Sequence, residues 1–244
     1  MSRTASISFL GSLNDFLPPK KRGQAAVLSF NGGQTIKHLI ESLGVPHVEV
    51  SCILAGGRPV DFSYQVEDGD VLEVYPLAPA QENKDEEQRF ILDNHLGQLA
   101  IYLRMLGFDA LYRNDFQDEE LANLASQKDR TLLTRDRRLL MRNQVERGYW
   151  VRNTLPRQQL VEIVRRFDLS DWIRPFRRCM RCNSLLQPVE KSAVLDRLEP
   201  LTRQYFEEFR ICPDCHRIYW KGSHYERMRR FIEQVLQSVG TGYE

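Results

Sequence analysis

Acidic residues follow apolar runs at three places in the middle of the chain. Asp93 comes directly after one short apolar run, and Asp136 comes two residues after another. Asp118 and Glu119 open the helical pattern that follows a third run. In open α/β sheets the carboxyl ends of the strands meet at one edge, where ligands bind. Carboxylates gathered there repel one another unless a cation lies between them, and their oxygens suit Mg²⁺ or Mn²⁺. The pattern therefore predicts a metal-binding acidic cluster.

A simpler interpretation is open for each acid alone. Asp93 or Asn94, Asp118 and Asp136 could each cap the first turn of a helix, since aspartate and asparagine are favoured N-cap residues. Their repetition at corresponding strand–helix junctions favours a shared site. One or two divalent ions held there could activate water and stabilise the leaving oxygen of a phosphodiester. The candidate catalytic residues are therefore Asp93, Asp118, Glu119 and Asp136.

Four of the five cysteines form two CxxC pairs, Cys179 with Cys182 and Cys212 with Cys215, separated by a 29-residue insert. Each pair can aim two thiolates at one ion, and two pairs complete a tetrahedral sulfur site for Zn²⁺. No open position would remain, so the zinc is predicted to be structural. Free thiols and a metal site indicate a reducing, cytoplasmic compartment. The fifth cysteine, Cys52, is expected in a core.

The elements around the acids alternate between strand and helix. Strands are predicted at 90–92, 110–112, 131–134 and 149–151, with helices at 96–106, 118–128, 137–143 and from a Thr154 cap onward. Such alternation predicts a parallel sheet with right-handed crossovers. In the cysteine module a helical stretch is expected within 193–209, and a last amphipathic helix at about 225–239.

The first 78 residues read as strand, strand, helix, strand, strand, at 5–10, 25–30, 35–43, 48–54 and 71–75. With the segments ILAGGRPV (53–60) and EDGDVLEVYP (67–76), this order resembles a ubiquitin-like β-grasp of the sulfur-carrier branch. Sulfur carriers end in a free Gly-Gly tail, whereas this chain continues past Pro76. The resemblance therefore favours a docking or substrate-positioning role, or a protein partner, over carrier chemistry.

Charge is distributed unevenly along the chain. Residues 1–88 hold 7 basic and 12 acidic side chains, net −5, whereas 89–175 hold 15 and 12 and 176–244 hold 12 and 9, each net +3. The basic part could meet a polyanion such as RNA. No apolar run is long enough to cross a membrane. The predicted domains are 1–80, 88–175 and 176–244, with a polar linker at 81–88.

The central and C-terminal segments are similar to the Mut-seven C-terminal RNase family, a group of PIN-like nucleases that end in a zinc ribbon. The matching segments are FILD (90–93), LGQLA (96–100), LRMLGFD (103–109), LLTRD (132–136), the two CxxC pairs and IYWKGSH (218–224). Bacterial members with a ubiquitin-like front end also belong to the family pattern. The resemblance implies an α/β PIN-like parallel sheet with a C-terminal zinc ribbon, plus an N-terminal α+β ubiquitin-like β-grasp domain.

The resemblance further implies a metal-dependent ribonuclease with Asp93 as first acid, Asp118 or Glu119 as middle acid and Asp136 as the acid after Thr-Arg. PIN-like nucleases often carry a fourth acid at the position where this chain has Asn153. The resemblance therefore leaves open whether the site holds one metal ion or two. A non-catalytic RNA-binding or adaptor protein with a degenerate site is the alternative. Basic residues near the acids and beside the knuckles are predicted to bind cellular RNA, single-stranded or structured: Arg135, Arg137, Arg177, Arg178, Arg181 and Lys221.

Overall fold

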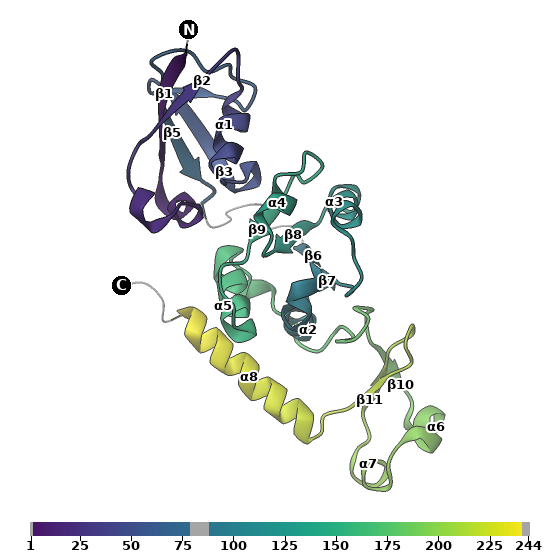
Figure 1. Cartoon of the computed structure of the whole chain (residues 1–244). Coiled ribbons are helices and arrows are strands. Elements are labelled where there is room, and N and C mark those ends of the chain that lie inside the picture. Colours follow the sequence, from purple (N-terminus) through teal and green to yellow (C-terminus); the bar gives the residue numbers. More distant parts are fainter. Residues whose placement is uncertain (1, 79–87, 241–244) are drawn as a thin grey trace. The chain divides into compact units, whose positions relative to one another are not determined.

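The computed structural model describes residues 2–78 and 88–240, and Figure 1 shows the course of the chain. The chain forms two compact units, one of Met1–Gln81 with Gln117–Trp150 and the other of Glu82–Phe116 with Val151–Glu244. Except for its last residue, the predicted linker 81–88 lies outside the described residues. No helix in the described parts of the chain is long and apolar enough to span a bilayer.

The N-terminal region is a five-stranded mixed sheet in the order β2-β1-β5-β3-β4, in which β1 runs parallel to β5. Its elements are β1 Arg3–Phe9, β2 Ala26–Phe30, α1 Ile36–Ser42, β3 Val50–Ala55, β4 Arg58–Val60 and β5 Val71–Pro76. In β1, Ala5, Ile7 and Phe9 point into the core, as their period of two predicts. The predicted ubiquitin-like fold is confirmed.

Three short 3-10 helices in this region carry no periodic signal and were not predicted: η1 Gly11–Phe16, η2 Pro19–Lys21 and η3 His47–Glu49. The prediction that Cys52 lies in a core was wrong, because its side chain is exposed. The pairing of β3 with β5 shifts register between Val50 and Cys52. This irregularity interrupts the alternation of inward and outward side chains along β3, from which the position of Cys52 would be predicted.

The following region alternates strand and helix, as predicted. Its elements are β6 Arg89–Leu92, α2 Gly97–Leu106, β7 Asp109–Leu111, α3 Asp118–Gln127, β8 Thr131–Thr134, α4 Arg137–Leu140, β9 Gly148–Trp150 and α5 Pro156–Arg166. The strand order is β7-β6-β8-β9, and β6 pairs with β7, and β8 with β9, in parallel. The predicted parallel α/β sheet is therefore confirmed.

Helix boundaries depart from the sequence predictions at three points. Gln117 is the N-cap of α3, so Asp118 is the first helical residue and not the cap. Leu155, not Thr154, precedes α5, because Pro156 fills the first helical position with its fixed φ. Helix α4 ends at Leu140, three residues before the predicted end.

The C-terminal module contains a three-stranded antiparallel sheet of β10 Gln187–Val189, β11 Phe209–Ile211 and β12 Ile218–Tyr219. The insert between the cysteine pairs forms the short helices α6 Lys191–Val194, η6 Leu195–Arg197 and α7 Pro200–Tyr205 in place of one helical stretch. Val194, Leu198 and Phe209 form its small core. The predicted combination of a parallel sheet with a small cysteine-bearing sheet is confirmed.

The last helix, α8 Ser223–Gly240, packs against α5, and Figure 1 shows the two helices side by side. Phe231 of α8 stacks on Tyr102 of α2 with 4.7 Å between ring centroids. Ile232 and Val235 are the buried residues of α8, and their spacing of three residues places them on one face of the helix. The C-terminal helix thus closes the hydrophobic face of α2 and α5.

Candidate functional site

The four knuckle cysteines lie together, with their Sγ atoms all within 4.8 Å of one another. The Sγ–Sγ distances are 3.5 Å for Cys179–Cys215 and 3.3 Å for Cys182–Cys212. A tetrahedral zinc with Zn–S bonds of about 2.3 Å requires sulfurs roughly 3.8 Å apart, so a small expansion would admit the ion. Four sulfur donors in this arrangement indicate a structural zinc site.

Both knuckles use the same backbone turn to aim their sulfurs. In the first, the Asn183 N–H donates to the Cys179 carbonyl at 2.9 Å; in the second, the His216 N–H donates to the Cys212 carbonyl at 3.0 Å. Asn183 and His216 both have positive φ, 75° and 56°. Each turn therefore needs a residue that tolerates the left-handed region directly after its second cysteine.

The second knuckle holds its two thiols in an environment that opposes their ionisation without a cation. Burial raises the pKa of the Cys212 thiol to about 12 and also raises the pKa of Cys215. Burial likewise opposes ionisation of Cys182, but hydrogen bonds from Ser184 and from the thiols of Cys212 and Cys179 together outweigh it and lower the pKa of Cys182 to about 6. Because zinc binds thiolates, its binding would displace protons from Cys212 and Cys215.

A buried guanidinium joins the first knuckle to the α/β domain. Arg104 lies on α2, is 2% exposed, and donates from Nε to the Ala110 carbonyl at 2.8 Å. Its Nη1 donates to the carbonyls of Met180 and Arg181 at 3.2 and 2.8 Å. Burial lowers the pKa of Arg104 from its ordinary value. One side chain thus satisfies backbone groups from two segments about 70 residues apart in sequence.

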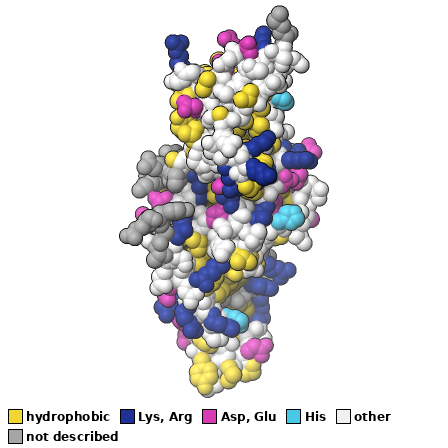
Figure 2. Space-filling model, turned by 60° about the vertical axis from the view of Figure 1, so that its left-hand side comes forward, with side chains coloured by type: hydrophobic (Ala, Val, Ile, Leu, Met, Phe, Trp, Pro, Cys, Tyr) yellow, Lys and Arg dark blue, Asp and Glu magenta, His cyan; other side chains and the backbone are white. Residues whose placement is uncertain are grey.

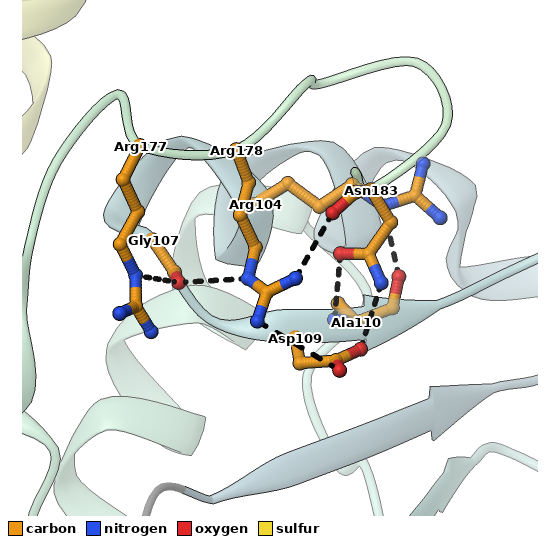
Figure 3. A network of polar contacts seen from close by, with 7 residues as sticks. All are labelled: Arg104, Gly107, Asp109, Ala110, Arg177, Arg178 and Asn183. Atoms are coloured by element: carbon orange, nitrogen blue, oxygen red, sulfur yellow. Dashed lines mark hydrogen bonds and ion pairs between the residues drawn. The ribbon is translucent and has the colours of Figure 1, made fainter. Parts of the chain in front are cut away.

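Further polar contacts surround this guanidinium, as Figure 3 shows. The Asn183 amide accepts from the Ala110 N–H at 3.1 Å and donates to Asp109 Oδ1 at 2.7 Å. Arg177 and Arg178 donate from Nε to the Gly107 carbonyl at 2.8 and 3.2 Å. These contacts hold Arg177 and Arg178 within the fold, and the RNA-binding role predicted for the two arginines stays a prediction. Nothing in the sequence pattern reveals such contacts, since their acceptors are backbone carbonyls.

The other two basic residues predicted beside the knuckles are exposed. Arg181 contributes its carbonyl to Arg104, whereas its side chain faces solvent. Lys221 is exposed and pairs with Glu208 at 2.8 Å. Near Lys221 lies a pocket of about 520 Å³. Its lining includes aromatic, methionine and basic side chains: Phe176, Met180, Tyr219, Trp220, Lys221 and Tyr225.

Asp93 follows β6 and is 4% exposed. It is the N-cap of the 3-10 helix η4 Asn94–Leu96, where its Oδ1 accepts from the His95 N–H at 2.9 Å. The capping interpretation is therefore confirmed for Asp93. A cap bond uses one carboxylate oxygen, so it is compatible with a second role as a metal ligand.

The remaining predicted acids belong to the other compact unit. Asp136 caps α4, since its Oδ1 accepts from the Arg138 N–H at 2.8 Å, and its side chain is exposed. Asp118 and Glu119 lie exposed in the first turn of α3, and Asp118 is 3.9 Å from Arg142. Within residues 2–78 and 88–240 the four cysteines are the group whose ligand atoms cluster closely enough to hold an ion. The metal role of the acids stays a prediction.

Two glutamates that sequence reasoning missed hold the backbone at the end of β9. Glu49 is buried at 3% exposure and accepts from the Trp150 N–H at 2.8 Å. Glu162, on α5, accepts from the N–H groups of Arg152 and Asn153 at 2.8 and 3.0 Å and from the Asn153 side chain at 2.7 Å. Glu162 therefore places a carboxylate beside Asn153, where the fourth acid was expected. In the sequence, the only signal for Glu162 is its position on α5, the helix that directly follows β9.

The order of a ubiquitin-like sheet, a parallel α/β sheet and a small antiparallel sheet with four clustered cysteines defines a PIN-like protein with a zinc-ribbon-type end. The model of the Mut7-C RNAse domain matches residues 88–232, and the model of the Mut7-C ubiquitin domain matches residues 2–82. The chain belongs to the Mut7-C RNase domain family, with a Mut7-C ubiquitin domain in front. No curated protein matches it.

Proposed function

We propose that this protein is a metal-dependent ribonuclease that hydrolyses phosphodiester bonds in RNA. The observation that carries the proposal is the match of an RNase domain model over residues 88–232. The chain also presents aspartates at strand–helix junctions, the place where α/β sheets bind ligands. The predicted domain boundaries, 1–80, 88–175 and 176–244, form part of the same proposal.

Carboxylate oxygens suit a hard divalent ion, so the donor chemistry of the acids fits Mg²⁺ or Mn²⁺. Asp93, Asp118 and Asp136 would hold the ion, with Glu119 as the substitute for Asp118. When bound, such an ion supplies Lewis acidity and activates water. The protein fixes two of these side chains in advance, because Asp93 and Asp136 each accept a cap bond from the backbone.

RNA contacts are proposed on the C-terminal module. The exposed side chains of Arg181 and Lys221 suit phosphates, and the rings of Trp220 and Tyr225 line the pocket near Lys221. Figure 2 shows Lys and Arg side chains gathered in the lower part of the visible face, at the level of α8. Helix α8 contributes exposed arginines of its own: Arg227, Arg229 and Arg230. Such a surface would bind a polyanion in a salt-dependent way.

A cleavage assay on mixed cellular RNA with added Mn²⁺ tests the proposal. Asp93→Asn should keep the fold, because asparagine is an equally good N-cap, and should lower the cleavage rate on the order of 100-fold or more. Asp196→Asn, an exposed aspartate in the cysteine module, is the matched control and should cleave as wild type does. A wild type that binds RNA without cleaving it would support the alternative of a non-catalytic adaptor. An Asp93→Asn protein with full activity would instead show that Asp93 does not hold the catalytic ion.

A further inference from the structure

The ubiquitin-like domain contacts the segment that carries Asp136. Both belong to one compact unit, and the contacts centre on Trp150 at the end of β9. The Trp150 ring packs against the hydrophobic core of the β-grasp and lies 5.0 Å from the Phe16 ring, centroid to centroid. Its backbone N–H donates to the buried Glu49. The end of β9 is therefore anchored in the β-grasp.

Arg137, the residue after Asp136, is held in the same place. Its Nη1 donates to the Phe16 carbonyl at 2.8 Å. Its guanidinium lies 3.9 Å from the centroid of the Trp150 ring and 5.2 Å from that of Phe16. A planar guanidinium can stack on rings and donate in its plane at once, which a lysine cannot do. We refer to Arg137, Phe16 and Trp150 as the clamp.

The residue before Asp136 is held by the clamp as well. The indole Nε1–H of Trp150 donates to the Arg135 carbonyl at 3.3 Å. Asp136 thus lies between two residues that are both fixed by Trp150. Two local bonds then set its own geometry: its N–H donates to Thr134 Oγ1 at 2.9 Å, and its Oδ1 accepts from the Arg138 N–H.

Two outer contacts join the same surfaces. His47 of η3 lies with Nε2 3.2 Å from the Val145 carbonyl and Nδ1 2.7 Å from Glu41. Lys37 of α1 donates to Asn143 Oδ1 at 2.8 Å. The segment from Arg137 to Trp150 is therefore attached to the β-grasp at both of its ends and at Asn143 and Val145 between them, which a tethered but independent domain would not require.

We propose that the ubiquitin-like domain acts as an intramolecular support that orients Asp136 through the clamp, and that Arg137 is a positioning residue and not a phosphate ligand. This rests on the proposed function, in which Asp136 is a metal ligand. Residues that fix metal ligands from behind typically change metal affinity or activity by about 10- to 100-fold when they are replaced. The β-grasp would then serve the reaction through geometry, without carrying a group itself.

Arg137→Lys separates the two roles, because lysine keeps the positive charge for phosphate but loses the stacked, planar contact. Trp150→Phe removes the indole donor to the Arg135 carbonyl and reduces the ring area against Phe16 and Arg137, while it keeps an aromatic ring at this position. Arg138→Lys, one residue along the same helix and exposed, is the control. All variants are made in the full zinc-loaded chain, and each is measured for amide hydrogen exchange at Asp136 and Arg138, for the Mn²⁺ concentration of half-maximal cleavage and for RNA affinity with Ca²⁺.

The clamp predicts that Arg137→Lys and Trp150→Phe speed exchange at both amides by about tenfold or more and raise the half-maximal Mn²⁺ concentration by about 10- to 100-fold. RNA affinity should stay at the wild-type value, and Arg138→Lys should change neither exchange nor metal requirement. Unchanged exchange in Arg137→Lys, or a loss of RNA affinity with unchanged exchange, would overturn the inference. If the wild type does not cleave RNA but the exchange rates change as expected, the proposed function fails and the clamp stands.

Discussion

Replacing Arg104 with methionine tests whether one buried guanidinium holds the cysteine module to α2 and β7. Three hydrogen bonds run from this side chain to the carbonyls of Ala110, Met180 and Arg181. Hydrogen bonds from a charged donor contribute about 1.5–3 kcal/mol each, and desolvation of the buried guanidinium offsets part of that. Methionine would remove the charge but leave the carbonyls unpaired. A buried carbonyl left without a donor typically costs about 1–3 kcal/mol, so three of them predict a loss of stability on the order of 3–5 kcal/mol once the removed desolvation of the guanidinium is subtracted.

Urea unfolding of zinc-loaded protein measures this loss as a shift in midpoint at constant slope. Arg104→Lys should fall between wild type and Arg104→Met, because an ammonium cannot reach all three carbonyls from one position. Arg181→Met changes a neighbouring exposed arginine and should stay within about 0.5 kcal/mol of wild type. The reasoning is refuted if Arg104→Met unfolds within about 1 kcal/mol of wild type, since burial and hydrogen bonding would then cancel.

Two further predictions concern the same part of the fold. Gly107 ends α2 with φ +102°, and an added Cβ would clash with the Arg174 carbonyl oxygen, so Gly107→Ala should cost at least about 2 kcal/mol by urea unfolding. Gly240→Ala, where an added Cβ meets nothing within 4 Å, should cost nothing, and equal effects at both sites would contradict the steric argument. Purified protein should hold about one zinc per chain by elemental analysis, and Cys212→Ser should lose it and destabilise residues 176–222. Acidification should release the zinc, because every thiolate must be protonated to leave; folded wild type without zinc would show that the cluster has another role.

The sequence predicts the regular parts of this fold because their periods are strong. Ala5, Ile7 and Phe9 alternate in β1, and Leu99, Leu103 and Leu106 recur on one face of α2. The spacing of the four cysteines in two CxxC pairs is typical of a tetrahedral zinc site and predicts that their sulfurs lie close together. The insert between the knuckles was harder, because Pro200 starts a new helix and breaks any continuous helical pattern.

Contacts between distant segments were not predictable in the same way. Arg177 and Arg178 look like phosphate ligands by charge, yet both donate to the carbonyl of Gly107, about 70 residues away. Arg104 lies beside Leu103 in an apolar helix face. Its acceptors are backbone carbonyls, which every residue type carries and which the sequence therefore does not distinguish. Side-chain identity sets what a group can bind, whereas the tertiary fold sets which partner it meets.

Among the acidic residues, some positions were predictable from the sequence and one was not. Sequence placed Asp93 and Asp136 at strand–helix junctions, and the structure makes both of them N-caps. It also shows Glu162 beside Asn153, a carboxylate that the pattern around β9 did not reveal. A residue type at a junction therefore predicts capping directly, while metal binding depends on convergence that only a measurement can establish.

The central claim is that Asp93 belongs to a divalent-metal site, and Mn²⁺ binding tests it most directly. Electron paramagnetic resonance of zinc-loaded protein titrated with Mn²⁺ counts bound ions without relying on catalysis. We expect one or two tightly bound Mn²⁺ ions per chain in wild type. In Asp93→Asn we expect the Mn²⁺ affinity to be at least about 10-fold weaker, at unchanged zinc content and fold. Equal Mn²⁺ binding by wild type and Asp93→Asn, or no binding by either, would contradict it.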